Sequence, residues 1–184
     1  MKIFFDTEFT GLHKNTSLIS LGMVDENGRS FYAEFTDYDK TQVNDWIQKN
    51  VINNLINDSN KIDYESNNWF VIGDKNFICT MLKKWLKEYD SVQLVSDVCH
   101  YDMVLFIDIF GTAFDLPSNV SPVCYDINTD IANICACTVR EAFDITREDL
   151  VEDEVLEIIG NTKHNSLYDA KVIKRIYEIT HEQY

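Results

Sequence analysis

An apolar run at the start of the chain leads directly into two carboxylates, Asp6 and Glu8, which are two residues apart. If the run forms a strand, both side chains face the same side, roughly 6–7 Å apart along the chain. Two carboxylates at the end of a buried strand repel each other and lose hydration. A divalent cation that prefers oxygen ligands, Mg²⁺ or Mn²⁺, would offset both effects. The pair therefore predicts either a metal site or a strand end whose acids face water.

The composition is that of an acidic globular protein. The 184 residues are 45% hydrophobic and 12% aromatic, which excludes a disordered chain and is enough for one well-formed core. We therefore expect a single domain over residues 1–184. With 16 Lys and Arg against 31 Asp and Glu, the formal charge is −15. This charge argues against broad electrostatic capture of nucleic acid, but an enzyme that binds only a few terminal nucleotides can tolerate it.

The cysteines and the lack of long apolar runs indicate the cellular compartment in which we expect the protein. The five cysteines are scattered, and Cys135 and Cys137 lack the two-residue gap of a zinc knuckle, so we expect free thiols in a reducing compartment. The residues before Asp6 are too few for a signal peptide, and no apolar run approaches the ~20 residues of a membrane span. These features predict a soluble, cytoplasmic protein with no membrane partner.

Hydrophobic periodicity predicts an α/β fold that opens with an antiparallel meander. Asn27-Gly28 is typical of the turn in such a hairpin. A segment rich in Asn, Asp and Ser at 57–68 favours an exposed loop, and the acidic segment 138–160 favours one or two short helices. Strands are expected over 3–6, 17–24, 30–35, 92–96 and 123–125, and helices over 41–56, 75–89, 101–110, 127–137 and 166–180, the first of them with a break near Asn50.

Two later stretches complete a pattern with the N-terminal acids. Tyr101-Asp102 lies in a predicted helix, and His164-Asn-Ser-Leu-Tyr-Asp169 opens the last one. In order, spacing and the His-x4-Asp form, these stretches and Phe5-Asp-Thr-Glu-Phe-Thr-Gly-Leu12 resemble the three motifs of the DEDDh 3′-5′ exonucleases, which include proofreading domains and oligoribonuclease. Leu18-Ile-Ser-Leu-Gly22, the Trp46 segment and the chain length resemble, more narrowly, the small mycobacterial-type exoribonucleases.

The resemblance implies a ribonuclease H-like fold, a mixed five-stranded sheet flanked by helices. It also implies a catalytic set that binds two Mg²⁺ or Mn²⁺ ions. Asp6 would bridge the ions, Glu8 and Asp169 would complete the tighter site, and Asp102 would act on the second ion through water. His164 would take the proton from the attacking water. Taken singly, these residues have simpler interpretations, such as a first-turn helix acid for Asp102 or a loop histidine for His164.

The resemblance also implies where the substrate binds. Backbone amides of Thr10-Gly11-Leu12 would hold the terminal nucleotide, with the Leu12 side chain beside its base. Phe9 stands where the commonest signature has Thr, which changes the details of this contact. Nothing in the pattern assigns Asp97, five residues before Asp102, to the site.

The expected function is that of a metal-dependent 3′-5′ exoribonuclease. It would act on single-stranded 3′ ends, favour RNA over DNA, and release nucleoside 5′-monophosphates by two-metal hydrolysis. The family resemblance alone also implies a possible homodimer. Two alternatives remain: a 3′-5′ DNA exonuclease, and a nucleic-acid-binding module that keeps the fold without the activity.

Overall fold

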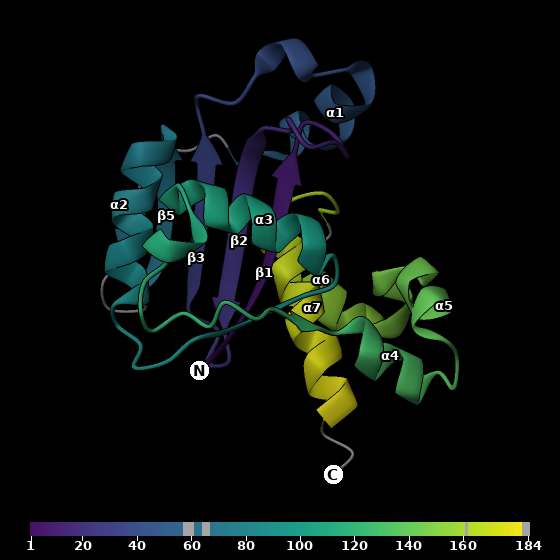
Figure 1. Cartoon of the computed structure of the whole chain (residues 1–184). Coiled ribbons are helices and arrows are strands. Elements are labelled where there is room, and N and C mark those ends of the chain that lie inside the picture. Colours follow the sequence, from purple (N-terminus) through teal and green to yellow (C-terminus); the bar gives the residue numbers. More distant parts are fainter. Residues whose placement is uncertain (57–60, 64–66, 161, 182–184) are drawn as a thin grey trace.

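The strands of the chain form one mixed sheet, with helices on both faces (Figure 1). The computed structural model describes residues 1–56, 61–63, 67–160 and 162–181. Within these ranges the sheet has seven strands in the order β4-β5-β3-β2-β1-β6-β7. Their bounds are Lys2–Phe9 for β1, Leu18–Asp25 for β2, Ser30–Phe35 for β3, Lys61–Asp63 for β4, Asn68–Gly73 for β5, Gln93–Ser96 for β6 and Tyr125–Asp126 for β7.

Strand β1 carries the two N-terminal acids inside the sheet. It pairs antiparallel with β2 on one side and parallel with β6 on the other. The run from Ile3 to Phe5 is fully buried, as expected for a strand covered on both faces. The strand continues beyond its predicted end at Asp6 as far as Phe9, so Glu8 also belongs to it.

The α/β class and the antiparallel opening are confirmed, but the sheet has two strands more than the five expected. All five predicted strands are present, and β4 and β5 extend the edge beyond β3. The loop predicted over 57–68 is wrong at Lys61–Asp63, which forms β4, while 57–60 and 64–66 lie outside the described residues. Strand β5 forms because Trp69 and Val71 are buried in the core while the backbone pairs in parallel with β3.

The helices agree with the prediction except in the segment 41–56. There, a short helix lies between two 3-10 turns. It begins later than expected, because Asn44 caps it by accepting a hydrogen bond from the amide of Ile47, and it ends at Asn50, where a break was expected. No helix in the described ranges is long and apolar enough to cross a membrane. The helices are α1 (Asp45–Asn50), α2 (Lys75–Leu86), α3 (Cys99–Phe110), α4 (Asn128–Ile134), α5 (Val139–Asp144), α6 (Asp153–Ile159) and α7 (Ser166–His181).

Two apolar cores lie on opposite faces of the sheet. Helices α2 and α3 pack on the face of Phe5, and α4 and α7 pack on the face of Phe4. Because side chains alternate along a strand, Asp6 and Glu8 share the face of Phe4. They therefore point toward the side of α7, whose first turn carries Asp169.

Small residues on β2 allow the start of α7 to approach the sheet closely. Gly22, which pairs with Asp6, has no side chain, and a Cβ there would lie 2.2 Å from the backbone nitrogen of Leu167. Ser20 lies with its hydroxyl oxygen 2.9 Å from that of Ser166. The small residues of β2 therefore set how near α7 lies to the acids of β1.

Replacing Gly22 by Ala should push α7 away from β2. The obstacle is backbone that cannot rotate aside, so the free energy of unfolding should fall by about 3 kcal/mol, the upper part of the usual range for overpacking. Urea denaturation measures this change, and the exonuclease activity expected from the motifs should fall with it because Asp169 moves.

The matched control is Gly28→Ala in the β2–β3 turn. Gly28 has a φ of 87° and nothing within 4 Å of its Cβ position, so Ala should cost only about 1 kcal/mol of backbone strain and leave activity unchanged. Equal losses of stability in the two variants, with full activity in both, would contradict the close approach of α7.

Candidate active site

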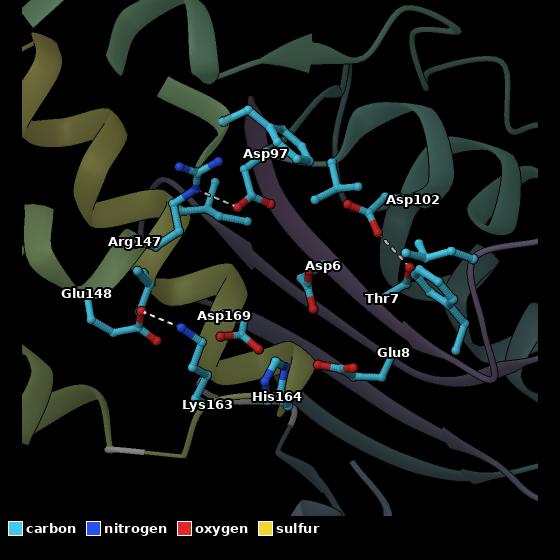
Figure 2. A pocket seen from close by; sticks show the side chains of 16 residues that line it. Asp6, Thr7, Glu8, Asp97, Asp102, Arg147, Glu148, Lys163, His164 and Asp169 are labelled. Carbon is cyan, nitrogen blue, oxygen red and sulfur yellow. Dashed lines mark hydrogen bonds and ion pairs between the residues drawn. The ribbon is translucent and has the colours of Figure 1, made fainter. Parts of the chain in front are cut away.

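The five residues predicted as catalytic line one cavity of about 350 Å³. It lies where β1 and β6 end, between the start of α3 and the start of α7 (Figure 2). We call it the first cavity. Figure 2 shows Asp6 at its centre, with the other acids around it and His164 at one side. The members that the sequence predicted are Asp6, Glu8, Asp102, His164 and Asp169.

The carboxylates form two triplets that share Asp6. Oxygens of Asp6, Glu8 and Asp169 lie within 4.8 Å of one another, and so do oxygens of Asp6, Asp97 and Asp102. A donor set made only of carboxylate oxygens fits hard divalent cations such as Mg²⁺ or Mn²⁺. The residues present therefore fit two such ions, with Asp6 able to contact both.

Two hydroxyl groups hold Asp102 in place. The residue is 1% exposed, and Thr7 Oγ1 donates a hydrogen bond of 2.6 Å to Oδ1. Ser96 Oγ donates to the other oxygen, Oδ2, and accepts from the amide of Val98. Sequence reasoning missed Thr7 and Ser96, although Thr7 stands between the two N-terminal acids and Ser96 ends a predicted strand.

Burial and repulsion from neighbouring carboxylates raise the pKa of every carboxyl group in the predicted set. For Asp6 and Glu8, burial raises the pKa well above the ordinary value, and the neighbouring Asp102 and Asp169 raise it further. Burial also raises the pKa of Asp102 to about 7, although the hydrogen bonds from its hydroxyl donors lower it. For Asp169, burial raises the pKa to about 8, and the negative charge of Asp97 contributes to this rise. The cluster thus retains protons near neutral pH unless a cation replaces them.

His164 stands in a strained loop just before α7. It is not a glycine, yet its φ is 63°, in the left-handed region that costs energy for a residue with a side chain. Burial lowers its pKa, and the nearby charge of Lys163 lowers it further. The Trp46 ring meets the imidazole edge-on, with centroids 5.1 Å apart. His164 is therefore held as a neutral base at physiological pH.

Asn165, which sequence reasoning also missed, fixes this loop to the rest of the fold. Its Oδ1 accepts hydrogen bonds from the amides of Leu167 and Tyr168, so it caps the start of α7. Its Nδ2 donates to Tyr32 Oη at 3.2 Å and to the carbonyl of Asn54 at 3.0 Å. The unusual backbone of His164 is thus stabilised by contacts on the residue that follows it.

Asp97 and Arg147 are further residues that the sequence did not assign to the site. Arg147 Nε donates to Asp97 Oδ2 at 2.7 Å, and its remaining nitrogens donate to Asn128 Oδ1 and to the carbonyls of Ala142 and Ile145. The arginine thus holds Asp97 in the second triplet. The acidic segment 138–160, which suggested only short helices, forms a wall of the cavity through Phe143, Arg147 and Glu148. One sequence feature could have identified Asp97: it is an acidic residue directly after β6, the strand that lies beside β1.

In the predicted substrate-binding loop, Thr10 and Gly11 stabilise the loop itself, whereas Leu12 is exposed. Thr10 is 3% exposed, and its Oγ1 accepts a hydrogen bond from the amide of Ser17. The amide of Gly11 donates to Thr16 Oγ1 at 3.0 Å, so both residues hold the loop together. Leu12, in contrast, is 71% exposed and lines the first cavity. A role in substrate binding stays a prediction for all three.

Two solved structures share the fold over nearly the whole chain. One is the nuclease domain of 3′hExo, described as a DEDDh family member bound to rAMP, with a TM-score of 0.65 and 14% identity, covering 99% of this chain and 92% of that one. The other is a 3′-exonuclease described in 3′-end specific recognition of a histone mRNA stem-loop. Its TM-score is 0.60 and its sequence identity is 16%, and the match covers 99% of this chain and 81% of that one. The fold is therefore that of DEDDh nuclease domains.

Sequence relatives identify the family within this class. Residues 1–180 match the family described as the 3′-5′ exoribonuclease Rv2179c-like domain. The 3′-5′ exoribonucleases Rv2179c and MT2234.1 of Mycobacterium tuberculosis are each 30% identical over 122 residues, which cover 65% of this chain and 67% of theirs. The chain belongs to this family and is a 3′-5′ exonuclease, which confirms the resemblance read from the motifs.

Without divalent cations, the free energy of unfolding should fall as pH rises from about 5 to about 8. Carboxyl groups of the unfolded chain titrate near pH 4, whereas the pKa values of Asp102 and Asp169 in the fold are about 7 and about 8. The folded state therefore holds more protons across this window and loses stability as they leave. Melting temperatures in EDTA across the window measure the effect.

Millimolar Mg²⁺ or Mn²⁺ should reverse much of this loss, because a bound cation replaces the protons. Asp169→Asn serves as the control, since it removes one titrating group and one donor and should weaken both the pH effect and the response to metal. A metal-free melting temperature that rises across the window, with no response to either ion, would contradict this interpretation of the cluster.

Proposed function

We propose that this exonuclease is a metal-dependent enzyme that removes nucleotides one at a time from single-stranded RNA 3′ ends and releases nucleoside 5′-monophosphates. The observation that carries the proposal is the pair of carboxylate triplets sharing Asp6, with the neutral His164 beside them. This arrangement matches what two-metal phosphodiester hydrolysis requires of a protein.

The two triplets would hold two ions, Mg²⁺ or Mn²⁺. When bound, such ions neutralise charge on the phosphate and lower the pKa of the attacking water. Asp6 would contact both, Glu8 and Asp169 would complete one site, and Asp102 would serve the other from its fixed position between Thr7 and Ser96. Asp97 offers the second site a further oxygen that the motifs did not indicate.

His164 would remove the proton from the attacking water. A group that accepts a proton in the reaction must be neutral beforehand, and the lowered pKa of His164 keeps it so. The edge-on Trp46 ring and the Asn165 contacts limit its movement. Activity should therefore rise with pH through the lowered pKa of this imidazole.

Several features favour a terminal nucleotide of RNA as the substrate. The first cavity has room for about one nucleotide, since its 350 Å³ lies at the small end of ligand pockets. The relatives in the family are named exoribonucleases, and a solved neighbour of the same fold is described with rAMP bound. A 2′-hydroxyl near the β1 end and the 10–12 loop could be recognised by hydrogen bonds worth about 0.5–1.5 kcal/mol each.

The test is digestion of 5′-labelled single-stranded RNA and DNA of matched sequence with Mg²⁺ or Mn²⁺. We expect a ladder that shortens from the 3′ end, with mononucleotide products, about tenfold faster on RNA and slowed at a duplex that must first fray. Equal or faster DNA cleavage would favour the DNA exonuclease instead. Internal cuts would exclude the exonuclease mechanism, and no cleavage despite bound metal would favour a binding module.

The matched variant in this assay is His164→Ala. Loss of a positioned base should lower kcat by roughly 10²–10⁴-fold. The melting temperature should still rise with added metal, because His164 is not among the proposed ligands. A His164→Ala enzyme that keeps the full rate would remove the residue from the mechanism while leaving the metal site intact.

A further inference from the structure

Cys99 and Cys124 lie side by side, although they are 25 residues apart in sequence. Both are free thiols, and Cys124 Sγ donates a hydrogen bond to Cys99 Sγ, with the two sulfur atoms 3.2 Å apart. The sulfur atoms of a disulfide are about 2.05 Å apart, so this pair needs to approach by only about 1.2 Å to form one. Neither the motifs nor the proposed chemistry gives these thiols a role.

The pairing of two strands keeps these thiols together. Cys99 is the first residue of α3, which follows β6, and Cys124 directly precedes β7. Strands β6 and β7 pair in parallel, with Val95 opposite Tyr125. Cys99 Sγ also donates to the carbonyls of Ser96 at 3.4 Å and Tyr125 at 3.2 Å, one on each strand. The contact between the thiols is therefore fixed by the sheet.

One thiol of the pair is accessible to a small oxidant. Cys124 is partly exposed and its neighbour Val123 is 67% exposed, whereas Cys99 is 9% exposed. A peroxide can therefore reach Cys124 first, and the buried Cys99 is in place to react with the oxidised product. The hydrogen bond with Cys99 raises the pKa of the Cys124 thiol, and burial raises it further, so thiolate is scarce and the first step is slow. The pair should therefore respond to millimolar oxidant and not to traces.

A bond between these thiols would act on Asp102. This acid lies about one helical turn after Cys99, so a displacement of the first residue of α3 moves its carboxylate. Ser96, whose hydroxyl holds Asp102 Oδ2, also contacts Cys99 through its carbonyl. A displacement of about 1 Å in a catalytic arrangement can lower the rate by about 10²-fold. Closing the gap between the thiols should therefore reduce activity without unfolding the protein.

We propose that Cys99 and Cys124 are a modification site, which a peroxide converts to a disulfide, and that this bond lowers the exonuclease activity by moving Asp102. The formation of the bond is independent of the proposed function, whereas its effect on activity rests on the role proposed there for Asp102. In a reducing compartment such a bond is transient, because thiol reductants break it.

The oxidation takes place in two steps. The sulfur of Cys124 attacks one oxygen of hydrogen peroxide, the oxygen–oxygen bond breaks, and a sulfenic acid and one water form. The sulfur of Cys99 then attacks the sulfur of the sulfenic acid, the sulfur–oxygen bond breaks, and a second water leaves with the proton of the Cys99 thiol. Two thiols have lost two electrons and one peroxide has accepted them. Dithiothreitol reverses the change by thiol–disulfide exchange.

The chemical part of the test is peptide mapping of the metal-free enzyme after treatment with millimolar hydrogen peroxide and blocking of the remaining thiols. A protease that cuts before aspartate places the two cysteines on different peptides, because Asp102 lies between them. We expect a linked pair of peptides that contain Cys99 and Cys124, and its loss after dithiothreitol. Oxidised enzyme without this linked pair would overturn the modification site.

The functional part measures kcat on labelled single-stranded RNA with Mg²⁺ after the peroxide has been removed. The value for wild type should fall roughly 10–10²-fold and return with dithiothreitol. Cys124→Ser should keep the basal rate and resist peroxide, since the bond cannot form. Cys135→Ser is the matched control, because it removes an exposed thiol outside the pair and should leave the enzyme as sensitive as wild type.

Each remaining outcome has a separate meaning. A linked pair with unchanged kcat, or an equal loss of activity in Cys124→Ser, would overturn the effect through Asp102. A reduced wild-type enzyme that is inactive on RNA would overturn the proposed function, and peptide mapping would still decide the modification site. If Cys124→Ser melts at a lower temperature than wild type, Cys99→Ser removes the other half of the bond, and sensitivity to peroxide that persists there would count against the proposal.

Discussion

The repulsion among carboxylates around Asp6 is the constraint on which the rest of the site depends. Asp6 belongs to two triplets at once, and burial raises the pKa of all four predicted carboxyl groups, those of Asp6, Glu8, Asp102 and Asp169. A fold that brings these groups together without a cation loses stability, so the surrounding structure must hold them in place. The carboxylates therefore supply the chemistry of the enzyme, and their repulsion is also the main local effect that lowers the stability of the fold.

Three kinds of contact hold the acids against this repulsion. Gly22 admits the start of α7 to the sheet and so brings Asp169 to β1. Hydrogen bonds from Thr7 and Ser96 occupy both oxygens of Asp102. Arg147 donates to Asp97, and its other nitrogens donate to two backbone carbonyls and to the side-chain oxygen of Asn128. The contacts of Gly22 with α7, of Thr7 with Asp102 and of Arg147 with Asp97 join segments that are distant in sequence, which explains why one cavity can draw on most of the chain.

The sequence predicts the part of the site that depends on residue identity and order. The motif acids and His164 come together in one cavity as expected, and the five predicted strands are all present in the sheet. Strand β5 was missed because its short apolar run directly precedes a helix cap, where it looks like part of the helix start.

The residues that support the site could not be predicted, because their roles depend on contacts with segments that are distant in sequence. Asn165 is an ordinary helix cap in sequence, and only the fold shows it bound to Tyr32 and Asn54. Arg147 lies in an acidic stretch without a motif, and its contact with Asp97 spans 50 residues. Single-sequence patterns describe neighbours along the chain and faces of helices and strands, but they do not describe which loops meet.

The central claim, that two cations share Asp6, is tested most directly by anomalous diffraction at the manganese edge from crystals grown with Mn²⁺ and a nucleoside 5′-monophosphate. The account predicts two peaks, one among Asp6, Glu8 and Asp169 and one among Asp6, Asp97 and Asp102, and the loss of both in Asp6→Asn. Peaks elsewhere in the molecule, or two peaks that persist at full height in Asp6→Asn, would contradict it.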